Sequence, residues 1–185
     1  MNFDGWHLIG QFDSDVGSWL LVNGGDAMLL EVPEGLTVRH VRQVLKDTGA
    51  ALRFITASHD HEDHIDAATW AELLITFPDA RPIHPANVCG YGRLDLDGEP
   101  ILLVKAPKHS LTDMVVIFRG VAMTGDIELG TLQSVTDEVT ETTRRKSMKR
   151  LRDFPQRAGY HIHSIVSAHL NDIRTSVNWP ELFSI

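Results

Sequence analysis

The sequence predicts an α/β protein in which strands and helices are arranged in layers. Runs of strand-like residues alternate with segments of helical periodicity along the chain. Several polar clusters follow directly after strand-like runs, where loops that carry function tend to lie. The chain has 185 residues, of which 43% are hydrophobic, so a single domain over residues 1–185 with its own core is expected.

The first part of the chain predicts four short strands and one helix. The strands are expected at residues 6–9, 18–22, 27–31 and 53–58. The Asn-Gly-Gly sequence at 23–25 predicts a hairpin turn between the second and third of them. Val38, Val41 and Leu45 recur at helical spacing, and Gly49 is typical of a helix end, so the intervening segment is expected to be a helix.

The rest of the chain continues the alternation. A second helix is expected from Ala67 to Phe77, because its apolar residues form one stripe and Pro78 follows. Extended segments are expected at residues 82–84, 101–105, 114–118, 121–124 and 162–168. A third helix is expected at 147–154, and the Gly-rich, acidic stretch at 90–99 carries no strand prediction.

Composition excludes several classes of protein. The share of apolar side chains is too high for a disordered chain, and no window approaches the roughly 20 apolar residues that cross a bilayer. A net charge of −8 disfavours a broad surface for nucleic acid. The single cysteine, Cys89, cannot form an internal disulfide and is expected to be a packed, inert thiol. No secretory signal is visible, so the cytoplasm is the expected location.

The strongest local signal is a block of metal-ligand residues after the fourth predicted strand. It contains His59, His61, Asp63 and His64, at positions that follow one another closely. In an extended or turn segment, residues two apart point the same way, so His59 and His61 can reach one ion. Imidazole and carboxylate are ligands that zinc and similar divalent ions prefer. Taken alone, the block is also compatible with a solvated polar loop that carries structural histidines.

Three further ligand-type residues follow later strands. His109 comes after the strand at 101–105, Asp126 after the strand at 121–124, and His169 after the last strand. If these strands are neighbours, all the groups converge on one edge of a sheet. A metal site at that edge is therefore expected.

The ordered set of motifs resembles the metallo-β-lactamase superfamily. The resemblance rests on the blocks SHDHEDH, KHSLTD, TGD and SAHLND, in that order. The spacings agree as well: 45 positions from His64 to His109, 17 from there to Asp126, and 43 more to His169. The resemblance implies a four-layer αβ/βα sandwich of the metallo-β-lactamase type that covers nearly the whole chain.

The resemblance also implies which residues hold metal. It assigns the first ion to His59, His61 and His109, and the second ion to Asp63, His64 and His169. Asp126 would bridge the two ions. Zinc is the expected metal, and iron and manganese remain open, because ligands alone do not choose the ion.

The chain departs from the family pattern at four positions near the site. Glu31 follows the early strand where the family usually has an aspartate, and it is open whether it replaces that group. Lys108 stands where a glycine is usual. Ser58 and Ser110 stand where threonine is usual.

The reaction that the resemblance implies is hydrolysis by a hydroxide shared between two metal ions, with Asp63 as the catalytic residue that orients it. The absence of any long extension after the last ligand favours a small ester, thioester or lactone as substrate. Alternatives are an iron-dependent oxidoreductase such as a sulfur dioxygenase, a phosphodiesterase, or a metal-binding scaffold without turnover.

A basic run near the third helix has two possible explanations. Six of the 17 cations of the chain lie within residues 144–152. They could attract an anionic substrate or a phosphate backbone, or they could be the solvated face of an amphipathic helix. The second explanation is favoured, so the expected partner is a small-molecule substrate, with no membrane and nucleic acid unlikely. The sequence makes no prediction of the oligomeric state.

Overall fold

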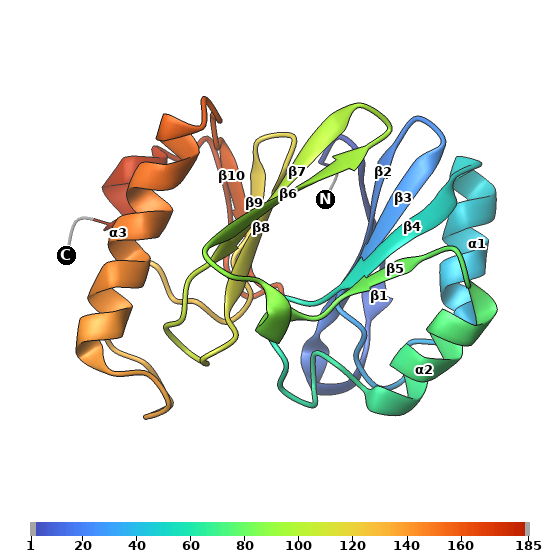
Figure 1. The fold of residues 1–185 in the computed structure, drawn as a ribbon, viewed down its shortest axis with the longest axis horizontal. Coiled ribbons are helices and arrows are strands. Elements are labelled where there is room, and N and C mark those ends of the chain that lie inside the picture. Colours follow the sequence, from blue (N-terminus) through green and yellow to red (C-terminus); the bar gives the residue numbers. More distant parts are fainter. Residues whose placement is uncertain (1–2, 184–185) are drawn as a thin grey trace.

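Two β-sheets face each other between layers of helix, as Figure 1 shows. The computed structural model describes residues 3–183. Helices α1 and α2 lie outside the first sheet, and α3 lies outside the second (Figure 1). This is the four-layer αβ/βα arrangement that was expected from the sequence.

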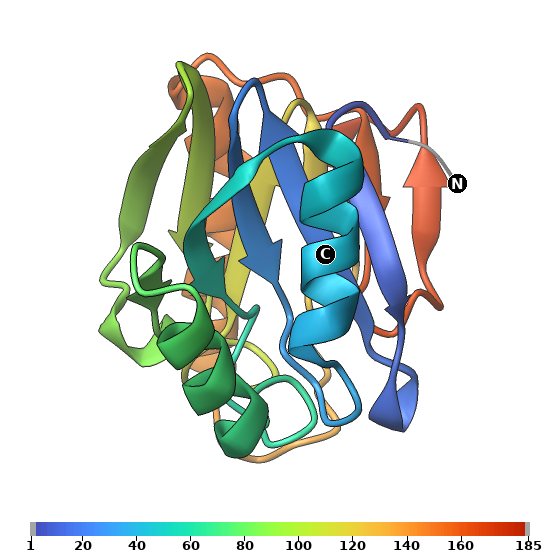
Figure 2. The same ribbon diagram turned by 90° about the vertical axis from the view of Figure 1, so that its right-hand side faces the viewer.

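The first sheet has five strands in the order β1-β2-β3-β4-β5. They are β1 (Trp6–Gln11), β2 (Gly17–Asn23), β3 (Asp26–Leu30), β4 (Ala51–Thr56) and β5 (Arg81–Ile83). The strands β1, β2 and β3 pair antiparallel, whereas β3, β4 and β5 are parallel to one another. Parallel neighbours need a crossover, and the helices α1 (Val38–Thr48) and α2 (Ala67–Thr76) provide it and cover the outer face (Figure 2).

The second sheet has six strands in the order β11-β10-β9-β8-β7-β6. They are β6 (Tyr91–Leu96), β7 (Glu99–Lys105), β8 (Met114–Phe118), β9 (Val121–Met123), β10 (Ser164–Val166) and β11 (Ile173–Thr175). Only β9 and β10 pair in parallel, and the helix α3 (Glu141–Arg157) connects them. Three short 3-10 helices complete the fold: η1 (Asp13–Asp15), η2 (Pro85–Asn87) and η3 (Trp179–Phe183).

Apolar side chains fill three separate layers of packing. Between the sheets, Trp6 and Trp19 meet edge to face, with ring centroids 5.8 Å apart. Val41 of α1 is fully buried against the first sheet, and Leu151 of α3 against the second. Burying side chains of this size contributes about 1.5–3 kcal/mol each, so the layers hold the strand ends in fixed relative positions.

The long third helix contains a proline whose cost is partly offset. Pro155 has no N–H to donate to the carbonyl of Leu151, one turn earlier. The indole N–H of Trp179, from η3, donates to that carbonyl at 2.8 Å. The last segment of the described chain therefore satisfies a backbone group that the helix itself leaves open.

Several predicted boundaries were wrong. The stretch 90–99 contains β6 and the start of β7, because Leu94 and Leu96 point inward while their neighbours are exposed. The third helix extends over Glu141–Arg157 and begins at the N-cap Thr140. The final predicted strand shrinks to Ser164–Val166. The edge strand β11 has only three residues, too few for a pattern, and the sequence did not predict it.

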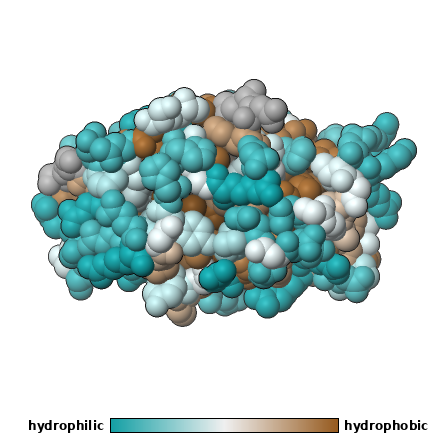
Figure 3. All heavy atoms as spheres, turned by 90° about the horizontal axis from the view of Figure 1, so that it is seen from above, coloured by the Kyte–Doolittle hydropathy of each residue, from teal (hydrophilic) through white to brown (hydrophobic). Residues whose placement is uncertain are grey.

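Cys89 is exposed, which contradicts the expectation of a packed thiol. No helix within residues 3–183 is long and apolar enough to cross a membrane. Figure 3 shows the edge of the sandwich that holds the hairpin turns, where hydrophilic residues dominate and hydrophobic atoms show only in small areas. The candidate site lies at the opposite edge.

Candidate metal centre

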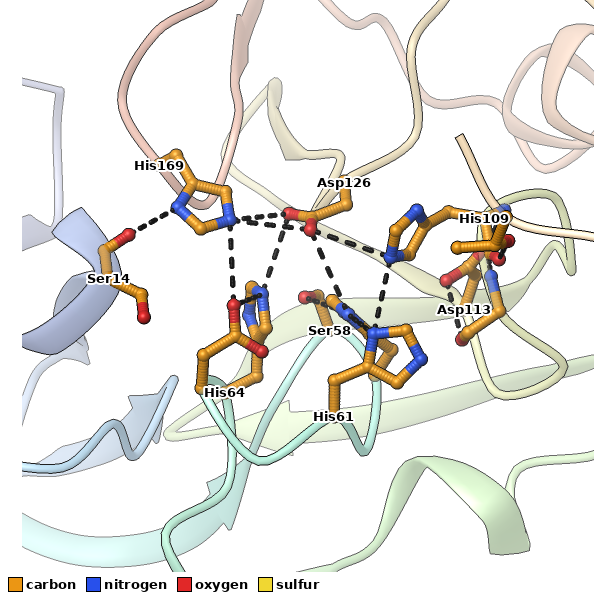
Figure 4. A network of polar contacts seen from close by, with 12 residues as sticks. Ser14, Ser58, His61, His64, His109, Asp113, Asp126 and His169 are labelled. Carbon is orange, nitrogen blue, oxygen red and sulfur yellow. Dashed lines mark hydrogen bonds and ion pairs between the residues drawn. The ribbon is translucent and has the colours of Figure 1, made fainter. Parts of the chain in front are cut away.

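The seven residues that were predicted as metal ligands lie together at one edge of the sandwich (Figure 4). The loop after β4 carries four of them: His59, His61, Asp63 and His64. The loops after β7, β9 and β10 carry one each: His109, Asp126 and His169. Because these strands end at the same edge, the two sheets together assemble one site.

Three ring nitrogens form a first group. His61 Nδ1 lies 3.1 Å from His59 Nε2 and 3.2 Å from His109 Nε2. In a tetrahedral site with zinc–nitrogen distances of about 2.0–2.1 Å, neighbouring nitrogens lie about 3.3 Å apart. Both of these separations are close to that value, so the three nitrogens are compatible with a zinc-sized ion.

The second group contains Asp63, His64 and His169. Asp63 Oδ2 lies 3.6 Å from His64 Nε2 and 3.9 Å from His169 Nε2. The His64 side chain is 0% exposed. Within residues 3–183, its Nε2 and the Oδ1 of Asp126 are buried and have no hydrogen-bond partner. Such atoms are costly to leave unpaired, so a cation between them would satisfy both.

Asp126 lies between the two groups. Its Oδ2 is 3.9 Å from His59 Nε2 and 3.7 Å from His109 Nε2. Its Oδ1 is 3.5 Å from His64 Nε2 and 3.3 Å from His169 Nε2. His169 Nε2 lies 3.3 Å from Oδ2 as well, so the carboxylate lies between the two groups, as a carboxylate shared by two ions would.

Glu31 lies where the resembling family usually has an aspartate, and it makes two contacts that support the site. Its Oε1 accepts from the backbone N–H of Ser58 at 3.0 Å, and its Oε2 accepts from Nδ1 of His64 at 3.1 Å. Glu31 is fully buried and has φ +69°, an uncommon conformation for a residue with a side chain. The carboxylate fixes the His64 ring so that Nε2 faces the site.

Charges around the histidines shift their pKa values in opposite directions. Burial lowers the pKa of His59 to about 2, and the nearby His64 acts in the same direction. Burial also opposes a charge on His64, but Glu31 and Asp126 outweigh it and raise the pKa of His64 to about 10. A hydrogen bond with Asp126 raises the pKa of His169. The carboxylates thus create a site that favours positive charge.

Asp113 anchors the loop that carries His109, a role that the sequence analysis missed. Its Oδ2 accepts from the backbone N–H groups of Lys108, His109 and Ser110 at 2.8, 2.5 and 2.9 Å. A carboxylate shortly after a turn is a known partner for such amides, so the Ser-Leu-Thr-Asp sequence carried a usable signal. Lys108 fits where a glycine is usual because its Nζ donates to the carbonyl of Gln133 at 2.7 Å.

Close packing between the loops from the two sheets sets their separation. Gly125 has φ +60°, and a Cβ there would lie 2.7 Å from the Cβ and Oγ of Ser58. Glycine is therefore required beside Asp126. The backbone N–H of Met114 donates to the carbonyl of Ser58 at 2.7 Å, and Nδ1 of His169 contacts the carbonyl of Ser14 at 2.8 Å (Figure 4).

Two hollows open beside these ligands. One, of about 730 Å³, has Asp63 in its wall. The other, of about 470 Å³, has His109, Asp126 and His169 in its wall. A small molecule in either hollow would reach the ligand cluster.

The fold and the ligand cluster define a layered α/β protein with room for metal at one edge of two sheets. Comparison with known proteins agrees with that class. No family model matches the sequence, and no curated protein matches it significantly. The similarity lies with solved structures, and the chain has the metallo-β-lactamase fold.

Three of these structures illustrate the likeness. ETHE1 from Myxococcus xanthus is 17% identical, with a TM-score of 0.69 over 92% of this chain and 77% of its own. BLEG-1, a B3 metallo-β-lactamase, is 16% identical, with a TM-score of 0.64 over 92% of this chain and 93% of its own. A metallo-β-lactamase family protein from Thermus thermophilus, TTHA1429, is 16% identical, with a TM-score of 0.60 over 97% of this chain and 78% of its own. At this low identity, the TM-scores show that the fold is shared.

Proposed function

We propose that this protein is a metal-dependent hydrolase of small esters, thioesters or lactones. It binds two divalent ions, with zinc preferred. The observation that carries this proposal is the convergence of the seven ligand residues in three overlapping groups. Within each group the ligand atoms lie within 4.8 Å of one another, and the groups are His59, His61 and His109; His59, Asp63 and His64; and His64, Asp126 and His169. A single tetrahedral site uses at most four ligands, so a second ion accounts for the remainder.

The residues of the site have two proposed roles: some hold the metal ions, and others orient the metal ligands. His59, His61 and His109 would hold one ion, Asp63, His64 and His169 would hold the other, and Asp126 would be shared between them. When bound, two such ions lower the pKa of a water molecule to about 7 and stabilise the charge that develops on the substrate oxygen. Glu31 keeps the His64 ring oriented, and Asp113 does the same for the loop of His109.

Asp63 is the proposed catalytic residue. Its side chain is 32% exposed and lies at the wall of the larger hollow. From there its carboxylate accepts a hydrogen bond from the attacking water and orients it toward a substrate in that hollow. The chain therefore needs no serine or cysteine nucleophile.

A second candidate function is an iron-dependent oxidoreductase, such as a sulfur dioxygenase. The observation in its favour is the position of Asp126 Oδ2, 3.9 Å from His59 Nε2 and 3.7 Å from His109 Nε2. Two histidines and one carboxylate with open positions suit non-haem iron. The hydrolase is preferred because His61, Asp63, His64 and His169 would have no part in a mononuclear site of that kind.

The test is the metal content of protein purified without added metal, followed by activity assays with zinc and with iron. The expected result is two ions per chain and zinc-supported hydrolysis of an ester, thioester or lactone. His169→Ala should lower the stoichiometry, whereas the matched variant His161→Ala, at an exposed histidine, should not. One ion per chain together with iron-dependent oxygen consumption on a persulfide would favour the oxidoreductase instead. The proposed substrate is a small molecule, and the proposed location is the cytoplasm.

A further inference from the structure

The larger hollow beside the metal centre has a strongly acidic wall. Its carboxylate residues come from three segments of the chain: Asp13, Glu34, Asp60, Glu62, Asp63 and Asp66. No lysine or arginine lines it. We call this space the acidic hollow.

Histidine is the only basic residue that pairs with these carboxylates within residues 3–183, where His64 and His169 face Asp63. Within the described part of the chain, no Lys or Arg forms an ion pair with any carboxylate of the acidic hollow. Asp66 caps α2 by accepting from the N–H of Thr69 at 2.7 Å, and Asp60 accepts from Thr112 at 2.5 Å. Asp13, Glu34 and Glu62 are exposed. A concave wall of one sign concentrates the field over the space that it encloses.

The acidic hollow adjoins the ligand cluster through Asp63. Asp63 belongs both to its wall and to the ligand cluster, where its Oδ2 lies 3.6 Å from the Nε2 of His64. That nitrogen is buried, has no hydrogen-bond partner within residues 3–183, and points toward the cluster. The acidic hollow therefore opens beside the ligand cluster, and a molecule in it would lie next to the residues proposed to hold the metal ions.

The other approach to the metal centre also lacks a free cation. The smaller hollow contains one basic side chain, Arg174, and Asp172 holds it through two contacts of 2.7 and 2.8 Å. Glu128 and Asp126 line the same hollow. The cations of α3 line two separate hollows that contain none of the predicted ligands. An anionic substrate would therefore find no counter-charge except the metal ions.

The metal ions do not leave a large surplus of positive charge. Two divalent ions bring four positive charges, and the carboxylates of Asp63, Asp126 and Glu31 offset three of them. The remaining carboxylates of the acidic hollow then attract cations and repel anions that approach the site.

We propose that the acyl substrates of this site carry a positively charged group, such as an ammonium, which lies in the acidic hollow during hydrolysis. This inference rests on the proposed hydrolase function.

Three para-nitrophenyl esters of matched length test the proposal with the zinc-loaded protein. They are the ester of ω-aminohexanoate (cationic), that of hexanoate (neutral) and the half-ester of adipate (anionic). At an ionic strength of about 0.02 M, kcat/KM should be at least about tenfold higher for the cationic than for the anionic ester, and the ratio should shrink at about 0.5 M. Equal rates, or faster hydrolysis of the anionic ester, would overturn the inference and leave the hydrolase intact.

Two double variants locate the effect. Asp13→Asn with Glu34→Gln removes two charges of the acidic hollow whose side chains make no hydrogen bond or ion pair in the described chain. This variant should lower the ratio of kcat/KM for the cationic ester to kcat/KM for the anionic ester by about five- to tenfold. Glu72→Gln with Asp79→Asn removes two exposed carboxylates outside the hollow and should leave the ratio unchanged. A similar loss of the ratio in both variants would show that net charge alone sets the preference, which contradicts the proposal.

A binding measurement decides the case in which none of the esters reacts, an outcome that would count against the hydrolase itself. Hexylammonium and hexanol are titrated into the zinc-loaded protein, and backbone amide shifts are followed by NMR. Hexylammonium should shift the amides of Ser14, Glu34 and Ala67, hexanol should not, and the Asp13/Glu34 variant should lose the shifts. If hexylammonium causes no such shifts, or shifts the variant equally, the proposal is wrong.

Discussion

The helix α3 and the acidic hollow both concentrate charge of one sign, but they differ in how that charge is neutralised. On α3, Arg145 pairs with Glu141 at 2.7 Å and Lys149 with Asp153 at 2.6 Å, both one helical turn apart. The buried side of the helix contains Met148 and Leu151. This agrees with the expectation of an amphipathic helix with a solvated basic face. The carboxylates of the acidic hollow have no lysine or arginine partner within residues 3–183. Unpaired charges around a hollow are therefore a better sign of a site than charges that pair along a helix.

The largest expected effect falls on the residue that joins the acidic hollow to the metal centre. Asp63→Asn keeps the shape of the side chain but removes its charge. The second ion should bind more weakly, and kcat at full zinc occupancy should fall by about 10²–10⁴, because a positioned acid–base group contributes that much. Asp153→Asn on α3 is the control and should keep wild-type kcat. If Asp63→Asn binds two zinc ions and keeps a kcat near the wild-type value, Asp63 has no catalytic role beyond that of a metal ligand.

The next effect concerns the buried partner of His64. Glu31→Gln retains the size of the side chain but cannot accept from both Ser58 and His64 as the carboxylate does. Affinity for the second zinc ion should fall by about 10–100-fold, as is typical when a group that orients a metal ligand is changed. Competition with a zinc-binding dye measures this. The exposed Glu141→Gln serves as the matched control, and equal affinities of the two variants would contradict the role of Glu31.

The dependence of metal binding on pH gives a third test. The pKa of His64 is raised to about 10, so the metal-free folded protein holds a proton on His64 across neutral pH. The second zinc ion must displace that proton when it binds to His64. The affinity of the protein for this ion should therefore rise by at least about tenfold per pH unit between pH 7 and 9. Calorimetry in buffers of different ionisation enthalpy counts the released protons. Affinity that is constant or falls over this interval would show that His64 is neutral before the metal binds.

The smallest effect is expected on α3. Arg145→Gln with Lys149→Gln removes two exposed cations that are paired within the helix. Exposed pairs of this kind contribute about 0.3–0.5 kcal/mol, so the free energy of unfolding should change by less than about 1 kcal/mol. KM for the anionic ester should stay within about twofold of the wild-type value at low and high salt. A steep, salt-sensitive rise in KM would show that the cations of α3 contribute to substrate binding.

Local patterns in the sequence predicted most of the framework. The apolar spacing of Val38, Val41 and Leu45 placed α1, and all three residues are buried as expected. The histidine block could be placed because its ligand types follow closely after a strand, β4, which ends at Thr56. The division into one domain and the ligand roles of the seven residues stay predictions.

The features that the sequence left open or did not predict depend on contacts between distant segments. Glu31 meets His64 and Ser58 only because β3 and β4 are parallel neighbours. The strand β11 is an edge strand of three residues, and its pairing with β10 joins it to the second sheet. The exposure of Cys89 likewise follows from the loop between η2 and β6, which no periodic pattern defines.

The division of the site between two sheets also sets an order in time during synthesis. His64 completes the first ligand block, and His169 follows 105 positions later. At about 5–20 residues per second, a ribosome needs about 5–20 s to cover that distance. For that interval the nascent chain presents four candidate metal ligands without the complete second sheet that would enclose them. Pairing of β10 with β9, which brings His169 into place, is thus among the last steps that close the site.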